Sequence, residues 1–205
     1  MKKGICYIVG AGENHGLGFV PCPEDYVIAA DGGFAYLQRE GIRTDMIIGD
    51  FDSLTRPPEH GNVVALPSEK DDTDTIAAVR EGIVRGYGEF HIYCGTGGRF
   101  EHTFANIQTL AYLSRNGMRG WLIGGNEIMT AITDGALFLD GWKKGYISVF
   151  ALSDRAEGVS LRGLKYELED SVVSNSFPLG VSNEFLGRNS EISVKKGTLL
   201  IIYPK

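Results

Sequence analysis

Two aspartates stand two residues apart, directly after a short apolar run. The run Met46 to Ile48 is followed by Gly49, and Asp50 and Asp52 flank a phenylalanine. In extended backbone, side chains two residues apart point the same way, so both carboxylates can share a hard cation that also binds phosphate oxygens. The alternative is a turn in which the acids cap backbone amides. The preceding strand and a second acidic cluster favour the metal site.

That second cluster opens a predicted helix. Thr73 is suited to the N-cap position, and Asp72 and Asp74 flank it, where negative charge is favoured by the helix dipole. Capping alone does not account for so many carboxylates beside Lys70, and they would repel one another without a cation. We therefore expect Lys70 to contact a phosphate as a point charge, the alternative being a solvated surface lysine.

A glycine-rich segment follows the fifth predicted strand. It reads Gly95-Thr96-Gly97-Gly98-Arg99, and a helix is predicted to begin just after it. Glycines let backbone amides approach an anion closely, and the helix N-terminus adds to the attraction. Arg99 can hold a phosphate through two hydrogen bonds. A plain strand-to-helix turn is the alternative, and His102 either binds substrate or orients the turn.

Two familiar nucleotide motifs are missing. The sequence has no Gly-x-x-x-x-Gly-Lys-Ser/Thr segment, which excludes a P-loop kinase. Gly10 and Gly12 begin like a dinucleotide fingerprint, but His15 stands where the third glycine belongs, so a Rossmann oxidoreductase is not indicated. The sequence leaves two alternatives open for the glycine-rich loop from Gly10 to Phe19, namely a mobile segment or contact with the nucleotide.

The elements that must position these residues alternate between strands and helices. Apolar runs that are nearly continuous predict strands buried on both faces, and helical spacing predicts helices that each end at a glycine. In a parallel sheet of this kind, ligands bind beyond the carboxyl ends of the strands, where the polar clusters lie. The predicted strands are 5–9, 26–30, 46–48, 63–66, 90–94 and 121–123, and the predicted helices are 34–40, 74–85 and 101–116. The second helix would carry Ile76, Val79, Ile83 and Val84 on one face, and the third would carry Phe104, Ile107, Leu110 and Ala111 on one face.

The remaining sequence has a different pattern. Short apolar runs, including 147–152, 159–161, 172–174, 192–194 and 198–203, are separated by turn residues, and no helical period appears. This pattern predicts a small all-β sandwich. The sequence therefore predicts a mostly parallel α/β domain over residues 1–125, followed by a β-sandwich domain over residues 126–205.

Composition narrows the class of protein. The 205 residues are 43% hydrophobic and carry a formal net charge of −6, so there is no broad basic surface for nucleic acid. Three cysteines without metal-type spacing indicate reduced thiols in a cytoplasmic protein. No apolar stretch is long enough to cross a membrane, and the first apolar run is too short for a signal peptide.

Taken in order along the chain, these motifs resemble the bacterial thiamine pyrophosphokinase family. The matching segments span nearly the whole chain, and the family's architecture is an α/β domain followed by a β-sandwich. In one position the chain departs from the family pattern, because Glu101 replaces the usual Asp and moves the carboxylate outward by one methylene. The segments are Ala30–Gly33, Ile48–Leu54, Lys70–Asp74, Gly97–His102 and Gly180–Phe185.

The resemblance implies a reaction and a set of roles. The enzyme would transfer the diphosphoryl group of ATP to the hydroxyl of thiamine with Mg²⁺, giving thiamine diphosphate and AMP, in a homodimer whose active site lies at the interface. Ser182 and Asn183 would recognise the aminopyrimidine of thiamine. They would hold this thiamine beside the phosphates bound by the partner subunit. The implied metal ligands are Asp50, Asp52 and Asp74, and the implied phosphate-binding residues are Asp31, Lys70, Asp72, Thr73, Gly97, Gly98, Arg99 and His102.

Two other classes share part of this pattern. A metal-dependent glycosyltransferase would use Asp50 and Asp52 with a sugar nucleotide, but it leaves the Ser182-Asn183 segment without a role. A non-catalytic sensor of thiamine or nucleotide would tolerate loss of the three acids, all of which are present.

Overall fold

The structure, a computed structural model, describes residues 2–51, 61–67 and 71–205. Its chain forms two compact units, of which the first contains residues 1–106 and 122–125 and the second contains residues 107–121 and 126–205. Helix α3 (Phe100–Arg115) and strand β6 (Arg119–Ile123) cross from one unit to the other. The functional boundary at residue 125 stays a prediction.

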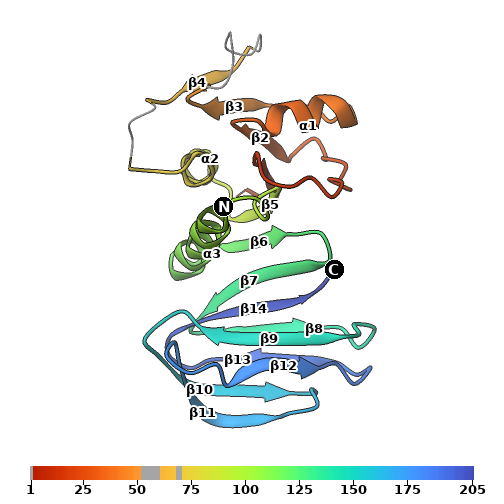
Figure 1. Ribbon diagram of the computed structural model, residues 1–205, viewed down its shortest axis with the longest axis vertical. Helices are drawn as coiled ribbons and strands as arrows, with labels where there is room; N and C mark the ends of the chain where they lie inside the picture. The colour runs from red at the N-terminus through yellow and green to blue at the C-terminus, as the bar shows by residue number, and fades with distance from the viewer. Residues whose placement is uncertain (1, 52–60, 68–70) are drawn as a thin grey trace. The chain divides into compact units, whose positions relative to one another are not determined.

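The first unit contains the predicted parallel sheet (Figure 1). Its strands run in the order β5-β1-β2-β3-β4, and β1 pairs in parallel with both β2 and β5. Nearly continuous apolar sequence buries the three central strands β1, β2 and β3 on both faces, as expected for a sheet covered by helices, whereas the edge strand β4 is partly exposed. The bounds are β1 Cys6–Val9, β2 Tyr26–Ala30, β3 Met46–Gly49, β4 Val63–Ala65 and β5 Glu89–Tyr93.

Helices cover both faces of this sheet. Helix α1 (Gly33–Glu40) buries Leu37 against alternate residues of the strands, including Val9 and Ala29. Helix α2 (Asp74–Val84) packs on the other face, where Gly82 comes so close to Cys6 that an added Cβ would lie 2.8 Å from its sulfur. Successive residues along β1 and β5 therefore point alternately into two separate apolar layers, one on each face of the sheet.

All three helices end at the glycines that the sequence indicated. Gly41, Gly86 and Gly117 have positive φ angles of 66°, 89° and 71°. The predicted apolar faces are buried in part: Val79, Leu110 and Ala111 are buried, but Val84 is 82% exposed and Phe104 is 50% exposed. Helix α2 also buries Ala78 and Gly82, and α3 also buries Asn106, Thr109 and Leu113.

The second unit is the predicted β-sandwich, which confirms the fold class. Antiparallel strands form one sheet in the order β12-β9-β14-β7 and another in the order β11-β10-β13-β8, and residues of both sheets share one apolar core. The bounds are β7 Glu127–Thr133, β8 Ala136–Leu139, β9 Tyr146–Ala151, β10 Arg155–Arg162, β11 Leu168–Ser174, β12 Gly180–Glu184, β13 Ser190–Ser193 and β14 Thr198–Pro204.

Among the described residues, no helix has both the length and the apolar character that crossing a bilayer requires.

Candidate active site

A cavity of about 590 Å³ lies within the first unit, at the carboxyl ends of its parallel strands. Its size is that of a pocket for a small organic ligand. Most of the predicted site residues line it, and they come from turns that are far apart in the sequence. The predicted residues in its lining are Asp31, Asp50, Asp72, Thr73, Asp74, Gly97, Gly98, Arg99 and His102.

The strands reach this cavity through strained backbone. Asp31, Phe51 and Cys94 have φ angles of 50°, 55° and 52°, and each stands one or two residues beyond the last residue of a parallel strand. Left-handed geometry at a residue other than glycine costs on the order of 1–3 kcal/mol and is often found at functional sites. Gly49 permits the turn at Asp31, because an added Cβ would lie 3.1 Å from the Asp31 Cα.

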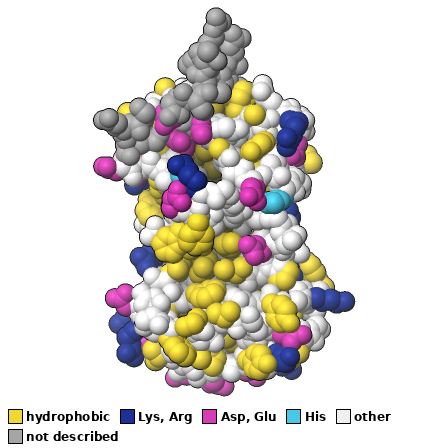
Figure 2. Space-filling view, viewed as in Figure 1, with side chains coloured by type: hydrophobic (Ala, Val, Ile, Leu, Met, Phe, Trp, Pro, Cys, Tyr) yellow, Lys and Arg dark blue, Asp and Glu magenta, His cyan; other side chains and the backbone are white. Residues whose placement is uncertain are grey.

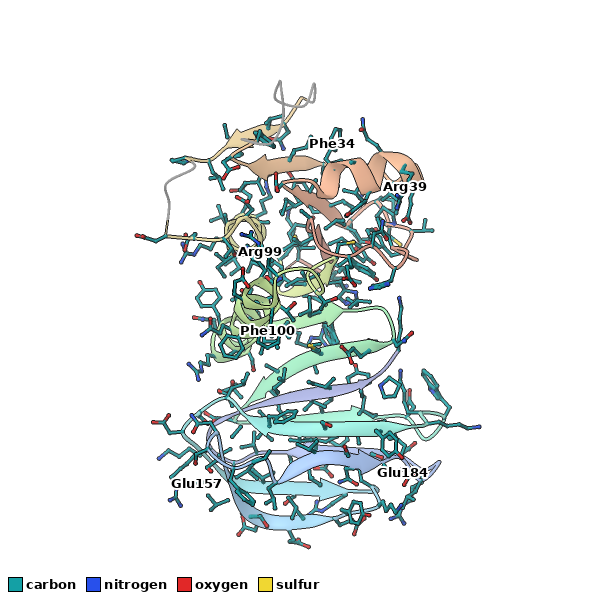
Figure 3. All side chains as sticks on the ribbon, viewed as in Figure 1. Phe34, Arg39, Arg99, Phe100, Glu157 and Glu184 are labelled. Atoms are coloured by element: carbon teal, nitrogen blue, oxygen red, sulfur yellow. The ribbon has the colours of Figure 1, made fainter. Side chains whose placement is uncertain are left out.

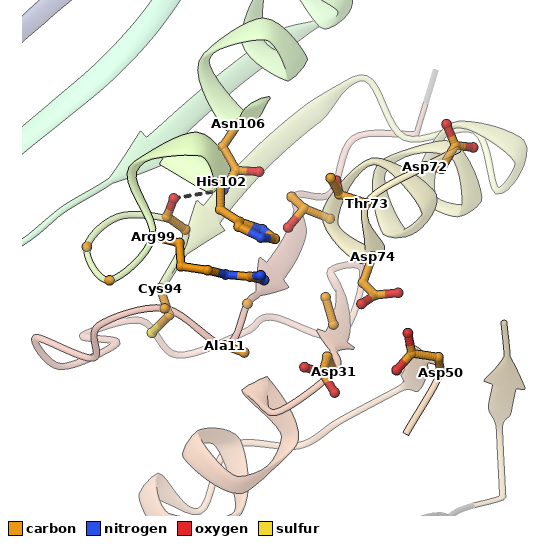
Figure 4. Close-up of a pocket in the computed structure, with 17 residues that line it drawn as sticks. Ala11, Asp31, Asp50, Asp72, Thr73, Asp74, Cys94, Arg99, His102 and Asn106 are labelled. Carbon is orange, nitrogen blue, oxygen red and sulfur yellow. Dashed lines mark hydrogen bonds between the residues drawn. The ribbon is translucent and has the colours of Figure 1, made fainter. Parts of the chain in front are cut away.

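Acidic residues occupy one end of the cavity and basic residues the other. In Figure 4, Asp50, Asp72 and Asp74 lie at one end, whereas Arg99 and His102 extend from the start of α3. Asp72 forms an ion pair with Arg80, which lies on the next turns of α2. A polyphosphate bridged by a cation matches this separation of charge.

Two helices begin at the cavity. Thr73 is the N-cap of α2, and its hydroxyl oxygen accepts a hydrogen bond from the Ile76 amide at 3.3 Å. The hydroxyl hydrogen stays available for a phosphate oxygen. Arg99 immediately precedes α3 (Figure 3), and its guanidinium is exposed, 3.7 Å from the Glu101 carboxylate. Both helix N-termini add positive potential at the cavity.

Two predicted residues, Asp52 and Lys70, lie outside the described residues. Among the residues that are described, no group of three His, Cys, Asp or Glu side chains is close enough to hold a metal ion. The aspartates that line the cavity nevertheless carry the oxygen donors that Mg²⁺ prefers. The chemistry of the donors thus fits a divalent cation, although the described part of the chain does not assemble a full ligand set.

The sequence did not indicate Asn106 as a site residue. It is 4% exposed and lines the cavity, and its amide nitrogen donates to the Gly95 carbonyl at 2.7 Å. This bond fixes the start of the glycine-rich loop. Asn106 follows His102 by four residues and so lies on the same face of α3, and this spacing could have predicted it as a site residue from the sequence. Gly95 and Ala30, which also line the cavity, belong to segments that the sequence did single out. The other lining residues outside the predicted set are Gly10, Ala11, Gly12, Thr75 and Cys94.

The remaining two predicted residues belong to the second unit. Ser182 has a φ angle of 56° at an irregularity in β12, and its amide donates to the Ser148 hydroxyl oxygen at 3.1 Å. Asn183 is buried, and its carboxamide bonds the backbone of Tyr166 twice: it accepts from the Tyr166 amide at 2.9 Å and donates to the Tyr166 carbonyl at 2.6 Å. Asn183 therefore fixes the segment that carries the exposed Tyr166 ring.

Comparison with known proteins gives one consistent answer. The family model described as thiamin pyrophosphokinase, catalytic domain, matches residues 23–122, and the model for the vitamin B1 binding domain of thiamin pyrophosphokinase matches residues 138–199. The chain is 29% identical over 182 residues to the thiamine pyrophosphokinase of Bacillus subtilis, a match that covers 85% of each chain.

Solved structures agree in fold over nearly the whole chain. The crystal structure of thiamine pyrophosphokinase from Bacillus subtilis is 25% identical, with a TM-score of 0.86 and coverage of 98% of this chain and 99% of that one. A thiamin pyrophosphokinase family protein from Enterococcus faecalis is 27% identical, with a TM-score of 0.81 and coverage of 98% of both chains. These matches favour this family over the glycosyltransferase and the sensor.

Cys94 allows a test of the cavity by chemical labelling. Burial raises its pKa to about 11, and since the thiolate is the reactive form, only about one molecule in 10³ is reactive at pH 8. We expect iodoacetamide to label the exposed Cys22 at pH 8 and to label Cys94 only as the pH approaches 11, as measured by peptide mass spectrometry. Circular dichroism at each pH verifies the fold, and a Cys22→Ser variant leaves only the buried Cys6 and Cys94 to react, which their separate peptides distinguish. Rapid labelling of Cys94 at pH 8 would contradict its burial.

Proposed function

The chain belongs to the thiamine pyrophosphokinase family, and from that premise we propose that it transfers the diphosphoryl group of ATP to the hydroxyl of thiamine, producing thiamine diphosphate and AMP. One observation carries the proposal. A single cavity is lined by aspartates at one end and by a glycine-rich loop with Arg99 at the other, which suits a metal-bound polyphosphate.

The phosphates of ATP would lie between the two helix N-termini. The Gly97-Gly98 backbone and the Arg99 guanidinium offer donors from one side, and the Thr73 hydroxyl offers a donor from the other. Arg99 can follow a moving phosphoryl group because its side chain is exposed. Asp31, Lys70, Asp72 and His102 complete the proposed phosphate-binding set.

Mg²⁺ would be held by Asp50, Asp52 and Asp74. When bound, the cation neutralises charge on the phosphate oxygens and aligns the transferred group. Of these three aspartates, Asp50 follows β3 and Asp74 begins α2, so two separate elements present carboxylates to one cavity. The support is the convergence of oxygen donors, which is the donor type that this cation selects.

The thiamine hydroxyl would attack the β-phosphorus while the bond to the α-phosphate oxygen breaks and AMP leaves. Its proton must pass to a base, and we assign that role to a carboxylate at the start of α2, either Asp72 or Asp74, both of which line the cavity.

Thiamine would bind at the Ser182-Asn183 segment. Because the carboxamide of Asn183 is already bonded to the Tyr166 backbone, we assign it an indirect role, in which it holds the exposed Tyr166 ring in place for the aminopyrimidine. The Ser182 side chain, exposed at a strained turn, would contact the substrate directly.

Assembly and location complete the proposal. We place the catalytic domain at residues 1–125, the thiamine-binding and dimerisation domain at residues 126–205, and the active site at a homodimer interface. The second unit exposes large apolar side chains such as Phe138, Trp142 and Tyr146, and Figure 2 shows hydrophobic side chains on the face of this unit turned to the viewer, as an association surface requires. Free cysteines support a cytoplasmic location.

The reaction itself is tested by the nucleotide it releases. Purified protein with ATP, Mg²⁺ and thiamine should form AMP and thiamine diphosphate in equal amounts, and neither product should form without thiamine. Chromatography of both products measures this. Thiamine-dependent ADP would instead indicate transfer of a single phosphoryl group, and no product from folded protein would contradict the proposal.

Neutral replacements at the acidic end should remove activity without unfolding the protein. We expect Asp50→Asn and Asp74→Asn to lower kcat by about 10²-fold or more, because the loss falls on charge stabilisation in the transition state. Asp140→Asn, an exposed aspartate of the second unit, is the matched control and should keep full activity. Near-normal turnover in a folded Asp50→Asn protein would overturn the metal assignment.

The indirect role of Asn183 predicts that two variants are not additive. Tyr166→Ala should raise the KM for thiamine about threefold to tenfold and leave the KM for ATP unchanged. If Asn183 acts through Tyr166, then Asn183→Ala should add little further change in the KM for thiamine to a Tyr166→Ala protein.

The exposed Val172 of β11 supplies the control, since Val172→Ala should change neither KM. Fully additive effects of Asn183→Ala and Tyr166→Ala would show that Asn183 binds thiamine itself.

A further inference from the structure

A carboxylate lies on the loop that is proposed to bind phosphate. One oxygen of Glu13 accepts a hydrogen bond from the Gly98 amide at 3.3 Å. The backbone holds Glu13 there, because its own amide donates to the Thr96 carbonyl at 3.0 Å and the Gly12 amide donates to the Cys94 carbonyl at 2.7 Å. The loop after β1 is thus fastened to the loop after β5.

The side chain of Glu13 lies in the space that Gly97 leaves open because it has no side chain. A Cβ added to Gly97 would lie 2.3 Å from the Glu13 carboxyl carbon and 2.5 Å from its Cγ, so only glycine allows Glu13 to lie over the loop. The second carboxylate oxygen is 3.3 Å from His15 Nε2. The His15 ring in turn packs over Gly125, where an added Cβ would lie 3.1 Å from it.

This arrangement conflicts with phosphate binding at the same amide. A backbone amide has one hydrogen, and Gly98 already directs it toward Glu13. A carboxylate at this position also repels a polyphosphate. The bond is long and exposed, so breaking it costs little.

We propose that Glu13 holds the Gly98 amide when no nucleotide is bound and gives it up to a phosphate oxygen when ATP binds. The inference rests on the function proposed above. Glu13 is a positioning residue in this scheme: it keeps the loop formed while the cavity is free of nucleotide, and its negative charge lowers the affinity for ATP. The same competition favours release of the nucleotide product.

The charge of Glu13 is tested by Glu13→Gln, which keeps the length of the side chain. We expect the Kd for ATP with Mg²⁺, measured by titration calorimetry without thiamine, to fall about threefold to tenfold. Glu24→Gln is the matched control, because it removes one exposed negative charge from the same unit and should leave the Kd unchanged. Unchanged or weaker binding by Glu13→Gln would overturn the proposal.

The exchange of Glu13 for a phosphate oxygen at the Gly98 amide can be followed by NMR at the resonance of that amide. In ¹⁵N-labelled protein, the Gly98 amide should differ between wild type and Glu13→Gln in the free state and coincide once both are saturated with a non-hydrolysable ATP analogue. A difference that persists at saturation would show that Glu13 keeps its bond, which contradicts the exchange.

These outcomes separate this inference from the proposed function. A wild type that binds ATP, but forms no thiamine-dependent AMP, refutes the function and leaves the exchange to stand on the binding and resonance data. A wild type that forms AMP, while Glu13→Gln binds ATP no more tightly, refutes the exchange alone. Failure of the wild type to bind ATP refutes both.

Discussion

The parallel pairing of β1 with its two neighbours is the constraint on which the cavity depends. Cys6 to Val9 pair in unbroken register with Tyr26 to Ala29 on one side and with Phe90 to Tyr93 on the other. Parallel strands in one register end at the same edge, so the segments that follow them must meet there. The close approach of Gly33 to this edge, where an added Cβ would lie 1.9 Å from the Val9 carbonyl oxygen, leaves no space for a side chain.

This convergence has an energetic cost that the buried strands offset. The left-handed residues Asp31, Phe51 and Cys94 each follow a strand whose residues are almost fully buried or paired in the sheet. Burial of one large apolar side chain contributes about 1.5–3 kcal/mol, which equals or exceeds the roughly 1–3 kcal/mol of a strained residue. The sheet can therefore hold strained turns at its edge, and these turns aim polar groups into the cavity.

The sequence predicted the elements well because apolar continuity and glycine stops are local signals. Gly41, Gly86 and Gly117 end their helices as expected, because the end of a helix depends on a left-handed backbone conformation that glycine adopts readily. The buried helix faces were harder to predict, because a face is defined by what packs on it. Phe104 is exposed while Asn106 is buried, and the buried Asn106 donates a hydrogen bond to the Gly95 carbonyl, eleven residues away in the sequence.

The strength of an existing hydrogen bond decides what a motif residue can do, and this comparison separates Asn183 from Glu13. Asn183 is 3% exposed, and its two bonds to Tyr166 are 2.6 and 2.9 Å long. Releasing them would leave buried polar groups unsatisfied at about 1–3 kcal/mol each, so Asn183 is best kept in place as a support. Glu13 makes one exposed bond of 3.3 Å, which water or a phosphate can replace at little cost. A motif residue whose bonds are short and buried therefore positions its neighbours, whereas one whose bond is long and exposed is free to exchange with a ligand.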